Sequence, residues 1–438
     1  MTHPAMDFET YSAAGYEFDG VMFRKNGSGT GISLVGATVY SEHPSTEVLS
    51  LAYDLGQGQH LWIPGLPLPL DLFRFIQGGG VIEAWNSMFE YLIWKNVCHG
   101  RMGWPELPLR QLRDAMAKAR AYALPGKLSD AAKVVGLTQK GKDGTRLLNK
   151  FSVPRKPTLK NASLRLRPEE DPEDAARLYA YNLTDIEAEA SVASVCPELS
   201  PDELKLWLLD QEINARGVAI DKEGLSNCLE IVAQATAKYT NELYTITAGA
   251  VPLVTQVPAM KAWIERQGIP MPQLTKESVP LTLKRTDLPP AVRRVLEIRE
   301  IIGSSAVLKL HAINRQLGAD GRLHDLFAFN GAHTGRWAGR GSQPQNLPNS
   351  GPECFRCDAC GKHWANGNSE CPHCGSAGGY TTAEWCPEAA VDALGVIATR
   401  SLSAVEMYFG DAIAVVSGCL RGLFVPSPGY DFIGSDYN

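Results

Sequence analysis

The sequence predicts a mixed α/β protein whose second half is mainly helical. Short β-branched or apolar runs, separated by glycine and proline, share the first 200 residues with helical patterns. From about Ser200 the pattern changes to long helices joined by proline-rich connections. Six of the ten cysteines fall between Cys354 and Cys386, which indicates a small metal-bound module and not a disulfide framework.

Strand and helix patterns alternate through the first 136 residues. Runs between glycines and prolines predict strands at 35–40, 47–54 and 60–64, and a strand followed by a helix within 78–97. Helical spacing predicts helices at 70–77, 110–123 and 127–136. A further helix begins at Pro172, with Asp171 as its N-cap and acids in its first turn.

The segment from Lys140 to Arg167 is strongly basic. It carries nine lysines and arginines and a single acid, Asp143. Two interpretations stay open at this point. The segment is either a solvated loop or a strap that contacts the phosphates of a DNA strand.

The helical second half opens with the cap-like sequence Ser-Pro-Asp-Glu at 200–203, and this helix ends in a glycine turn before a short strand, 218–221. Long helices are predicted at 222–247 and 291–317. The proline-rich intervals between them are read as connections.

Composition and charge limit the function classes. Hydrophobic residues make up 44% and charged residues 21%, as in ordinary soluble proteins. No apolar run reaches the roughly 18 residues that span a bilayer, and the N-terminus lacks the pattern of a secretory signal. The net charge is −6 and the pI about 5.9, so any contact with nucleic acid must come from local basic patches.

Three short acidic patterns are spread over the N-terminal half. Asp7 and Glu9 form a D-x-E pair whose side chains share one face if the segment is a strand. Tyr181 and Asp185 are spaced i,i+4 and share one face of the predicted helix. Glu90 closes the sequence NSMFE, where a predicted strand turns into a helix. Each pattern alone is also typical of solvated acids.

In this order the three patterns resemble the motifs of the DEDD exonuclease superfamily, in its tyrosine-containing branch. The resemblance covers residues 5–195 and implies a ribonuclease H-like α/β domain. Glu90 departs from it, because the commoner pattern has Asp there. Converging carboxylates repel one another unless a cation binds between them, and oxygen ligands suit Mg²⁺ or Mn²⁺. The resemblance implies 3′→5′ nucleotide removal by two ions, with water oriented by Tyr181 and the ions held by Asp7, Glu9, Glu90 and Asp185.

The glycine- and arginine-rich segment His333 to Pro348 and the last residues, Phe432 to Asn438, resemble the opening of the palm of a phage-like family A DNA polymerase. Glycines let a backbone approach a ligand closely, and arginine and amide side chains bind phosphates, sugars and groove edges. The resemblance implies DNA contacts from Arg336, Arg340, Gln343, Gln345 and Asn346. The alternative is an ordinary glycine-rich loop.

By the same resemblance, Asp436, on a short apolar strand, is the first of two palm aspartates that bind the catalytic Mg²⁺ pair. One carboxylate cannot hold two ions in the required geometry, so we expect the chain alone not to polymerise. A gene fragment, an interrupted gene and half of a split polymerase completed by a second chain are open alternatives. The implied partners are primer–template DNA and single-stranded 3′ ends, with no membrane, in the cytoplasm (of a bacterial host if the chain is phage-encoded).

The cysteine cluster has the spacing of a zinc ribbon. Two C-x2-C pairs lie ten residues apart, and a glycine follows the second cysteine of each. The predicted ligands of a structural Zn²⁺ are Cys357, Cys360, Cys371 and Cys374. Cys354 and Cys386 are spare, and either His363 or His373 is a possible substitute for one ligand. The alternative is a set of unpaired thiols.

These readings predict an exonuclease domain at 1–198, a thumb and polymerase N-terminal part at 199–330, and the start of a palm at 331–438, with the ribbon inserted at 352–380. The function they favour is proofreading in a DNA polymerase. Two alternatives stay open: a DNA-binding or assembly subunit of a split polymerase, and a free-standing exonuclease.

Overall fold

The computed structural model describes residues 4–18, 22–23, 30–136, 143–155, 163–271, 273–348, 351–352, 354–364, 370–378, 380–383 and 387–433. The chain divides into two compact units. The N-terminal unit comprises Met1–Gly217 and Arg315–Gln343, and the C-terminal unit comprises Val218–Asn314 and Pro344–Asn438. The three predicted domains (exonuclease, thumb and start of the palm) divide the chain by function and not by compactness, and they stay a prediction.

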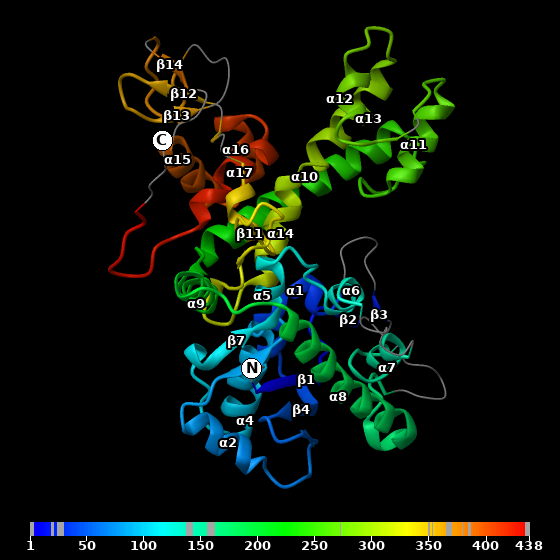
Figure 1. The fold of residues 1–438 in the computed structure, drawn as a ribbon. Coiled ribbons are helices and arrows are strands. Elements are labelled where there is room, and N and C mark those ends of the chain that lie inside the picture. The colour runs from blue at the N-terminus through cyan, green and yellow to red at the C-terminus, as the bar shows by residue number, and fades with distance from the viewer. Residues whose placement is uncertain are drawn as a thin grey trace. The chain divides into compact units, whose positions relative to one another are not determined.

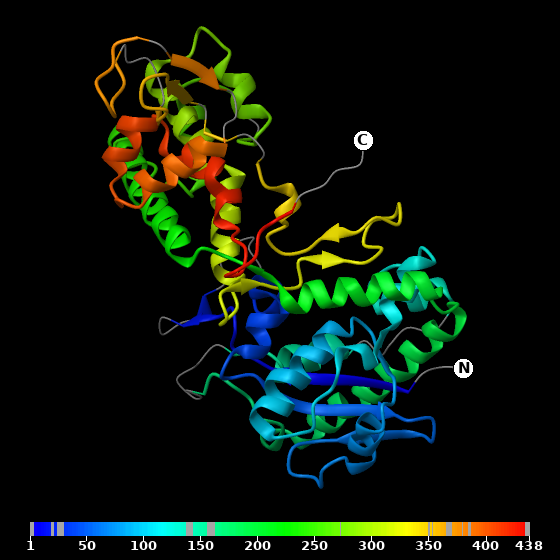
Figure 2. The ribbon, with the colours of Figure 1, turned by 90° about the vertical axis from the view of Figure 1, so that its left-hand side faces the viewer.

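A five-stranded sheet forms the centre of the N-terminal unit, and Figure 2 shows its first strand, in dark blue, beside a neighbouring strand. The strand order is β5-β4-β1-β6-β7. β1 pairs antiparallel with β4 and parallel with β6, which in turn pairs parallel with β7. The strands are β1 (Ala5–Tyr11), β4 (Glu47–Asp54), β5 (Gln59–Trp62), β6 (Ile82–Ala84) and β7 (Leu112–Asp114).

The alternation of side chains along β1 separates a core face from a polar face. Met6 and Phe8 are buried in the main hydrophobic core, where the Phe8 ring packs 6.4 Å from that of Trp94. Asp7 and Glu9 point to the other face because successive side chains alternate. In the register with β4, Asp7 lies opposite Ala52 and Glu9 opposite Ser50.

A long helix, α8 (Pro172–Val195), packs on β1 and β4 (Figure 1). It begins as predicted: the Asp171 side chain accepts a hydrogen bond from the backbone N–H of Asp174 at 3.2 Å, and proline occupies the first turn. Buried Leu178, Ile186 and Val192 attach its length to the unit. The helix therefore runs across the face of the sheet that carries Asp7 and Glu9.

The remaining elements of the N-terminal unit surround this sheet. The helices are α1 (Ile32–Glu42), α2 (Leu70–Gln77), α3 (Met88–Ile93), α4 (Gly100–Met102), α5 (Ala115–Ala121), α6 (Leu128–Val134), α7 (Gly144–Phe151) and α9 (Pro201–Arg216), with a π-helical stretch Trp94–His99 and 3-10 turns Leu109–Gln111 and Pro168–Glu170. The short strands are β2 (Glu17–Phe18), β3 (Met22–Phe23), β9 (Arg322–Leu323), β10 (Phe327–Ala328) and β11 (Ala338–Gly339).

The mixed α/β prediction is confirmed, and so are most of the elements predicted in the N-terminal unit, but two of these are wrong. The strand predicted at 35–40 is the helix α1, which buries Val35 and Tyr40, because packing overrides the weak strand preference of β-branched residues. The helix predicted at 110–123 begins later, since Leu112–Asp114 is β7 and Asp114 caps α5 through hydrogen bonds from the N–H groups of Met116 and Ala117.

The C-terminal unit is mainly helical, as predicted. Its helices are α10 (Lys222–Ile246), α11 (Val257–Arg266), α12 (Ser278–Leu283), α13 (Pro290–Ile302), α14 (Ser305–Gln316, whose last two residues belong to the N-terminal unit), α15 (Pro387–Ile397), α16 (Leu402–Phe409) and α17 (Ala412–Cys419), with 3-10 turns Pro344–Asn346 and Leu420–Leu423. The single helix predicted at 291–317 is therefore two helices, interrupted at Gly303 and Ser304.

Three short strands form a separate sheet in the C-terminal unit, in the order β13-β12-β14. They are β12 (Cys354–Cys357), β13 (His363–Trp364) and β14 (Tyr380–Ala383), and they lie beside α15 and α16 (Figure 1). The strand Val218–Ala219 is β8. Among the described residues, no single helix has the length and apolarity to cross a bilayer, and one bent pair, Leu402–Phe409 with Ala412–Leu423, meets the length and composition test.

Candidate metal centres and nucleic-acid contacts

Three of the predicted ligands come together on the polar face of the sheet. Asp7 and Glu9 project from β1, and Asp185 projects from α8, which crosses that face. One carboxylate oxygen of each lies within 4.8 Å of the others. Three carboxylates at this spacing repel one another unless they share protons or a cation, and hard oxygen donors fit Mg²⁺ or Mn²⁺. The donor set therefore fits the metal that the sequence predicted.

Asn182, which the sequence analysis did not single out, holds Asp7 in place. Its Nδ2 donates to Asp7 Oδ2 at 2.5 Å and to the Asp7 carbonyl oxygen at 3.3 Å. Ser50 Oγ donates to Asn182 Oδ1 at 2.9 Å, which fixes the orientation of the amide. Asn182 is fully buried. The available signal was its position, three residues before Asp185 on one helical face.

Glu90, the fourth predicted ligand, is not among the three acids brought within 4.8 Å. It lies on α3 and is 3% exposed. Burial first, and then repulsion by Asp7, raises the pKa of Glu90 well above its ordinary value. Its carboxyl is thus close enough to sense Asp7, and its role as a ligand stays a prediction.

A second buried acid near the group, Glu189, was also missed. It lies one turn after Asp185 on α8 and is 1% exposed. Burial, followed by the charges of Asp7, Glu83 and Glu90, raises the pKa of Glu189 well above its usual range. Among the described residues, its Oε1 has no hydrogen-bond partner. Without a cation, both Glu90 and Glu189 therefore favour the protonated form.

Tyr181 lies one turn before Asp185 and is partly buried. Burial first, then the Asp185 charge and a side-chain hydrogen bond to Asp185, raises the pKa of the Tyr181 hydroxyl above its ordinary value. The hydroxyl is thus held neutral beside the acidic group. A neutral hydroxyl next to a ligand carboxylate is able to orient a water molecule by hydrogen bonding.

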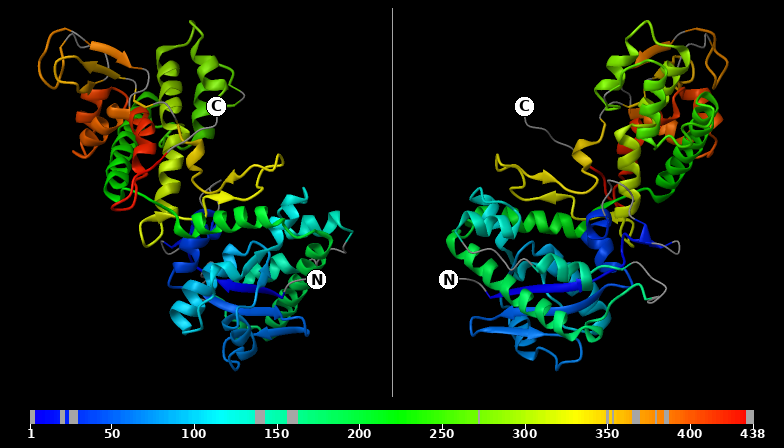
Figure 3. Two further views of the ribbon diagram at one scale, coloured as in Figure 1. Left: turned by 60° about the vertical axis from the view of Figure 1, so that its left-hand side comes forward. Right: turned by 90° about the vertical axis from the view of Figure 1, so that its right-hand side faces the viewer.

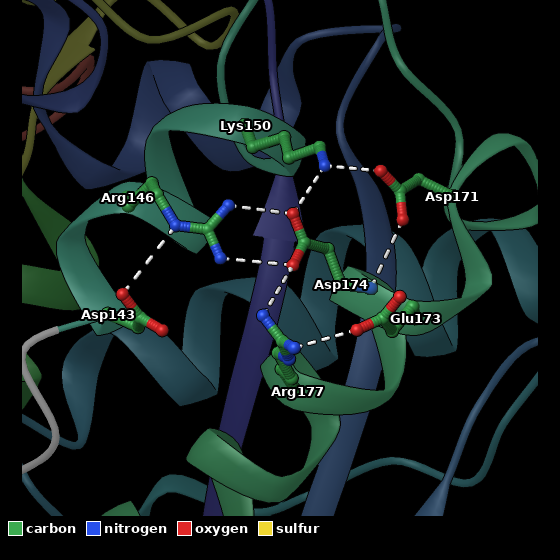
Figure 4. Close-up of polar contacts among 7 residues, drawn as sticks. All are labelled: Asp143, Arg146, Lys150, Asp171, Glu173, Asp174 and Arg177. Atoms are coloured by element: carbon green, nitrogen blue, oxygen red, sulfur yellow. Dashed lines mark hydrogen bonds and ion pairs between the residues drawn. The ribbon is translucent and has the colours of Figure 1, made fainter.

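The basic segment that could have been a DNA strap carries several cations that pair with acids of the same unit (Figure 4). Arg146 makes two hydrogen bonds to the Asp174 carboxylate, at 2.7 and 3.0 Å. Lys150 bridges Asp171 and Asp174. Figure 4 shows these residues joining α7 to the first turn of α8, together with contacts from Asp143, Glu173 and Arg177.

A further cation of the segment, Arg165, binds Glu47 at 2.6 Å and lies over the Tyr11 ring, 4.1 Å from its centroid. These contacts favour a structural role for Arg146, Lys150 and Arg165. Residues 140–142 and 156–162 of the segment lie outside the described residues.

The predicted DNA contacts divide between the two units. In the N-terminal unit, β10 and β11 form a two-stranded ribbon (Figure 3), and Arg336 is exposed in the turn before β11. Arg340 instead binds Asp325 at 2.8 Å and donates to Asn86 Oδ1 at 3.4 Å. Gln343 is partly buried, with a positive φ of 50°. Of the two arginines, Arg336 is thus the more accessible to a phosphate.

In the C-terminal unit, Gln345 and Asn346 are exposed on the 3-10 turn Pro344–Asn346. Two cationic side chains bind the backbone of this segment. Arg421 donates to the carbonyl oxygens of Leu347 and Pro348, each at 3.0 Å, and Lys309 donates to that of Asn346. The three carbonyl groups are therefore satisfied, and Gln345 and Asn346 remain exposed residues. Asp436, the predicted palm carboxylate, and the strand predicted around it lie outside the described residues, apart from 432–433, which are not in a strand.

The four predicted zinc ligands converge in the C-terminal unit, with one sulfur of each within 4.8 Å of the others. Both C-x2-C pairs form the same turn: Gly361 N–H donates to the Cys357 carbonyl and Gly375 N–H to the Cys371 carbonyl, each at 2.8 Å. Both glycines have a φ of 71°, a left-handed conformation that glycine adopts without strain.

Chemistry and geometry agree at this second site. The backbone N–H of Cys360 contributes most to lowering the pKa of the Cys357 thiol to about 7, which favours the thiolate that binds metal. The two histidines proposed as substitutes have other partners: His363 Nδ1 contacts Asp392 at 3.0 Å, and His373 Nε2 contacts the His363 carbonyl oxygen at 2.8 Å. A Cys₄ donor set closes the tetrahedron that structural zinc requires.

Known proteins that are similar to this chain include a phage DNA polymerase and the POL domain of a Pol1. No family model matches the chain. The chain is 30% identical over 419 residues to a DNA polymerase of Bacillus phage SP02, an alignment that covers 92% of this chain and 57% of the phage protein. The POL domain of Pol1 from M. smegmatis, solved in complex with DNA primer-template and dNTP, is similar with a TM-score of 0.40 at 14% identity, over 71% of this chain and 54% of that one. The predicted resemblance to a phage DNA polymerase is confirmed by this relative, and the chain spans a little over half of its length.

Proposed function

We propose that the N-terminal unit is a metal-dependent 3′→5′ exonuclease that proofreads within a phage-like DNA polymerase of family A. The observation that carries the proposal is the convergence of Asp7, Glu9 and Asp185 within 4.8 Å, from a strand and a helix separated by more than 160 residues. The sheet supports it: a central first strand, flanked by an antiparallel strand and by parallel strands, is compatible with a ribonuclease H-like domain.

Each residue of the site has its own role in the proposed reaction. Asp7, Glu9 and Asp185, with Glu90 as the fourth predicted ligand, would hold Mg²⁺ or Mn²⁺. Bound there, divalent ions supply an activated water and stabilise the leaving oxygen of the phosphodiester. The Tyr181 hydroxyl, beside Asp185, would orient the attacking water by a hydrogen bond. Asn182 fixes the Asp7 carboxylate through its side-chain amide.

DNA is the proposed partner of both units. The exposed Arg336, and the exposed Gln345 and Asn346, are able to contact phosphates, sugars and groove edges. We propose that Asp436 binds the catalytic Mg²⁺ of the polymerase and that DNA-directed synthesis is the activity of the whole protein. The four cysteines hold a structural Zn²⁺ in this proposal, supported by the matched turns around Gly361 and Gly375.

The exonuclease assignment is tested with the purified chain, Mg²⁺ and single-stranded DNA labelled at its 3′ end. We expect progressive loss of the label, and its suppression by EDTA and in an Asp7→Ala, Glu9→Ala double variant. Undiminished degradation by the double variant, at equal folded content by circular dichroism, would refute the assigned roles. Duplex binding without any Mg²⁺-dependent degradation by the parent chain would favour a DNA-binding subunit.

A further inference from the structure

The first residue of α7, Gly144, leaves room for the ring of Tyr181. A Cβ added at Gly144 would lie 2.3 Å from Tyr181 Cε2 and 2.7 Å from Tyr181 Cζ, far inside van der Waals contact. The φ of Gly144 lies outside the left-handed region, so its backbone conformation is open to any residue. Glycine is therefore required here by the position of the tyrosine ring and not by the turn of the chain.

The backbone that touches the ring is firmly attached to α8, the helix that carries Tyr181. Leu147 and Phe151 of α7 are buried in one hydrophobic cluster with Leu178 of α8. Arg146 makes its two hydrogen bonds to Asp174, and Lys150 binds the same carboxylate (Figure 4). Because apolar and ionic contacts join α7 to the first two turns of α8, moving α7 away from a larger side chain at 144 would break them.

Two contacts thus restrict the position of the Tyr181 side chain. On one side lies the Gly144 backbone, and on the other the hydroxyl meets the carboxylate of Asp185. A methyl group at 144 would displace the mobile partner, the far end of the tyrosine, and leave the anchored backbone in place. The hydroxyl would then shift relative to Asp185 and its two neighbouring acids.

We propose that α7 positions the catalytic tyrosine. Contact with the backbone at Gly144 fixes the orientation of the Tyr181 ring, so that its hydroxyl points toward the metal-binding carboxylates. This proposal rests on the exonuclease function proposed above. It also gives the basic segment a role that neither sequence interpretation contained, since Arg146 and Lys150 would serve the site by anchoring α7. Gly144 is then a positioning residue, acting through Tyr181.

The test is a double-mutant cycle between Gly144→Ala and Tyr181→Ala, measured as single-turnover removal of the 3′ nucleotide over a range of DNA concentrations. The matched control is Gly395→Ala, a glycine inside α15 whose added Cβ meets nothing within 4 Å. Displacing a catalytic group by about 1 Å costs on the order of 100-fold in rate. We expect Gly144→Ala to lower the maximal rate by about 10- to 100-fold at an unchanged half-saturating DNA concentration, and Gly395→Ala to match the parent.

In the Tyr181→Ala background the clash is gone, so Gly144→Ala should cause no further loss of rate. If Gly144→Ala alone folds poorly, the double variant should regain the melting temperature of Tyr181→Ala. Parent-like activity of folded Gly144→Ala, or the same fold-loss in both backgrounds, would overturn the proposal while leaving the exonuclease intact. An inactive parent chain would instead overturn the exonuclease function and this inference with it.

Discussion

The two candidate metal centres differ in how far apart along the chain their ligands lie. The four cysteines come from 18 consecutive residues, and two matched turns supply them. The three carboxylates come from β1 and α8, elements at opposite ends of the N-terminal 200 residues. The cysteine site is thus formed by local turns, whereas the carboxylate site exists only once the sheet has formed and α8 has packed across it.

This difference has an energetic consequence. A local thiolate site gains most of its order from the metal, and the binding free energy of structural zinc is largely folding free energy. The carboxylate site is held by contacts that need no metal, such as the Asn182 amide on Asp7 and the buried stretch of α8. We therefore expect chelation to unfold the cysteine module and to leave the carboxylate site in shape but inactive.

The largest expected effect comes from the helix half of the carboxylate site. Asp185→Asn keeps the shape of the side chain but removes a ligand charge, and the ions supply several kcal/mol of transition-state stabilisation. We expect the exonuclease rate to fall by about 1,000-fold or more. The exposed Glu187→Gln on the same helix is the control and should be neutral. Equal rates in the two variants would mean that α8 contributes no ligand.

The next effect is on zinc. Cys371→Ser removes one of four thiolates, so we expect the apparent zinc affinity to fall by roughly 100- to 1,000-fold, a quarter of the total binding free energy. Zinc content by mass spectrometry under native conditions and competition with a chelator measure this. The exonuclease rate should not change, because the carboxylates belong to the other unit. A nuclease defect in this variant would contradict the independence of the two centres.

A smaller effect is expected from the group that holds Asp7. Asn182→Ala removes the two hydrogen bonds to Asp7, and loss of such outer contacts typically costs 10- to 100-fold in activity or metal affinity. Thr184→Ala, two residues along on the exposed side, is the control. The measurement is the Mg²⁺ concentration for half-maximal exonuclease rate. A shift no larger than that of the control would show that Asp7 needs no such support.

The smallest effect is a pH dependence of stability in the metal-free protein. Because the pKa of buried Glu90 is raised, the folded state binds more protons than the unfolded state between the ordinary value near 4.5 and the raised one. The free energy of unfolding should therefore fall as pH rises through that window. Glu90→Gln should reduce this fall, because buried Glu189 still contributes, and should stabilise the protein at pH 8 by more than about 1 kcal/mol, but not at pH 4.

Urea unfolding with EDTA at the two pH values measures the Glu90 effect. Repeating it with Mg²⁺ sharpens the comparison between the centres: if Glu90 is the fourth ligand, the parent should gain more stability from Mg²⁺ than the Glu90→Gln variant does. Equal gains would exclude Glu90 from the ion-binding set.

Local signals predicted much of the fold and most of the site. The N-cap at Asp171 and the cysteine spacing depend on residues a few positions apart: the cap is confirmed, and the four cysteines come together, while their zinc stays a prediction. The strand predicted at 35–40 was wrong because burial of Val35 and Tyr40 decides that segment. The role of Asn182 could not be predicted, since it depends on which face of β1 meets α8. For the same reason the ring contact of Gly144 was invisible in the sequence.

The strand beside the acids has a consequence of its own. Ala52 and Ser50, which pair with Asp7 and Glu9, are among the smallest side chains available. Ala52 lies in a buried cluster with Ile186 of α8, and the Ser50 hydroxyl binds Asn182 of the same helix, so small side chains on β4 let α8 lie close against the sheet. A valine at position 52 would change none of the acids and would still push Ile186 and α8 away from β4, which would carry Asp185 away from Asp7 and Glu9.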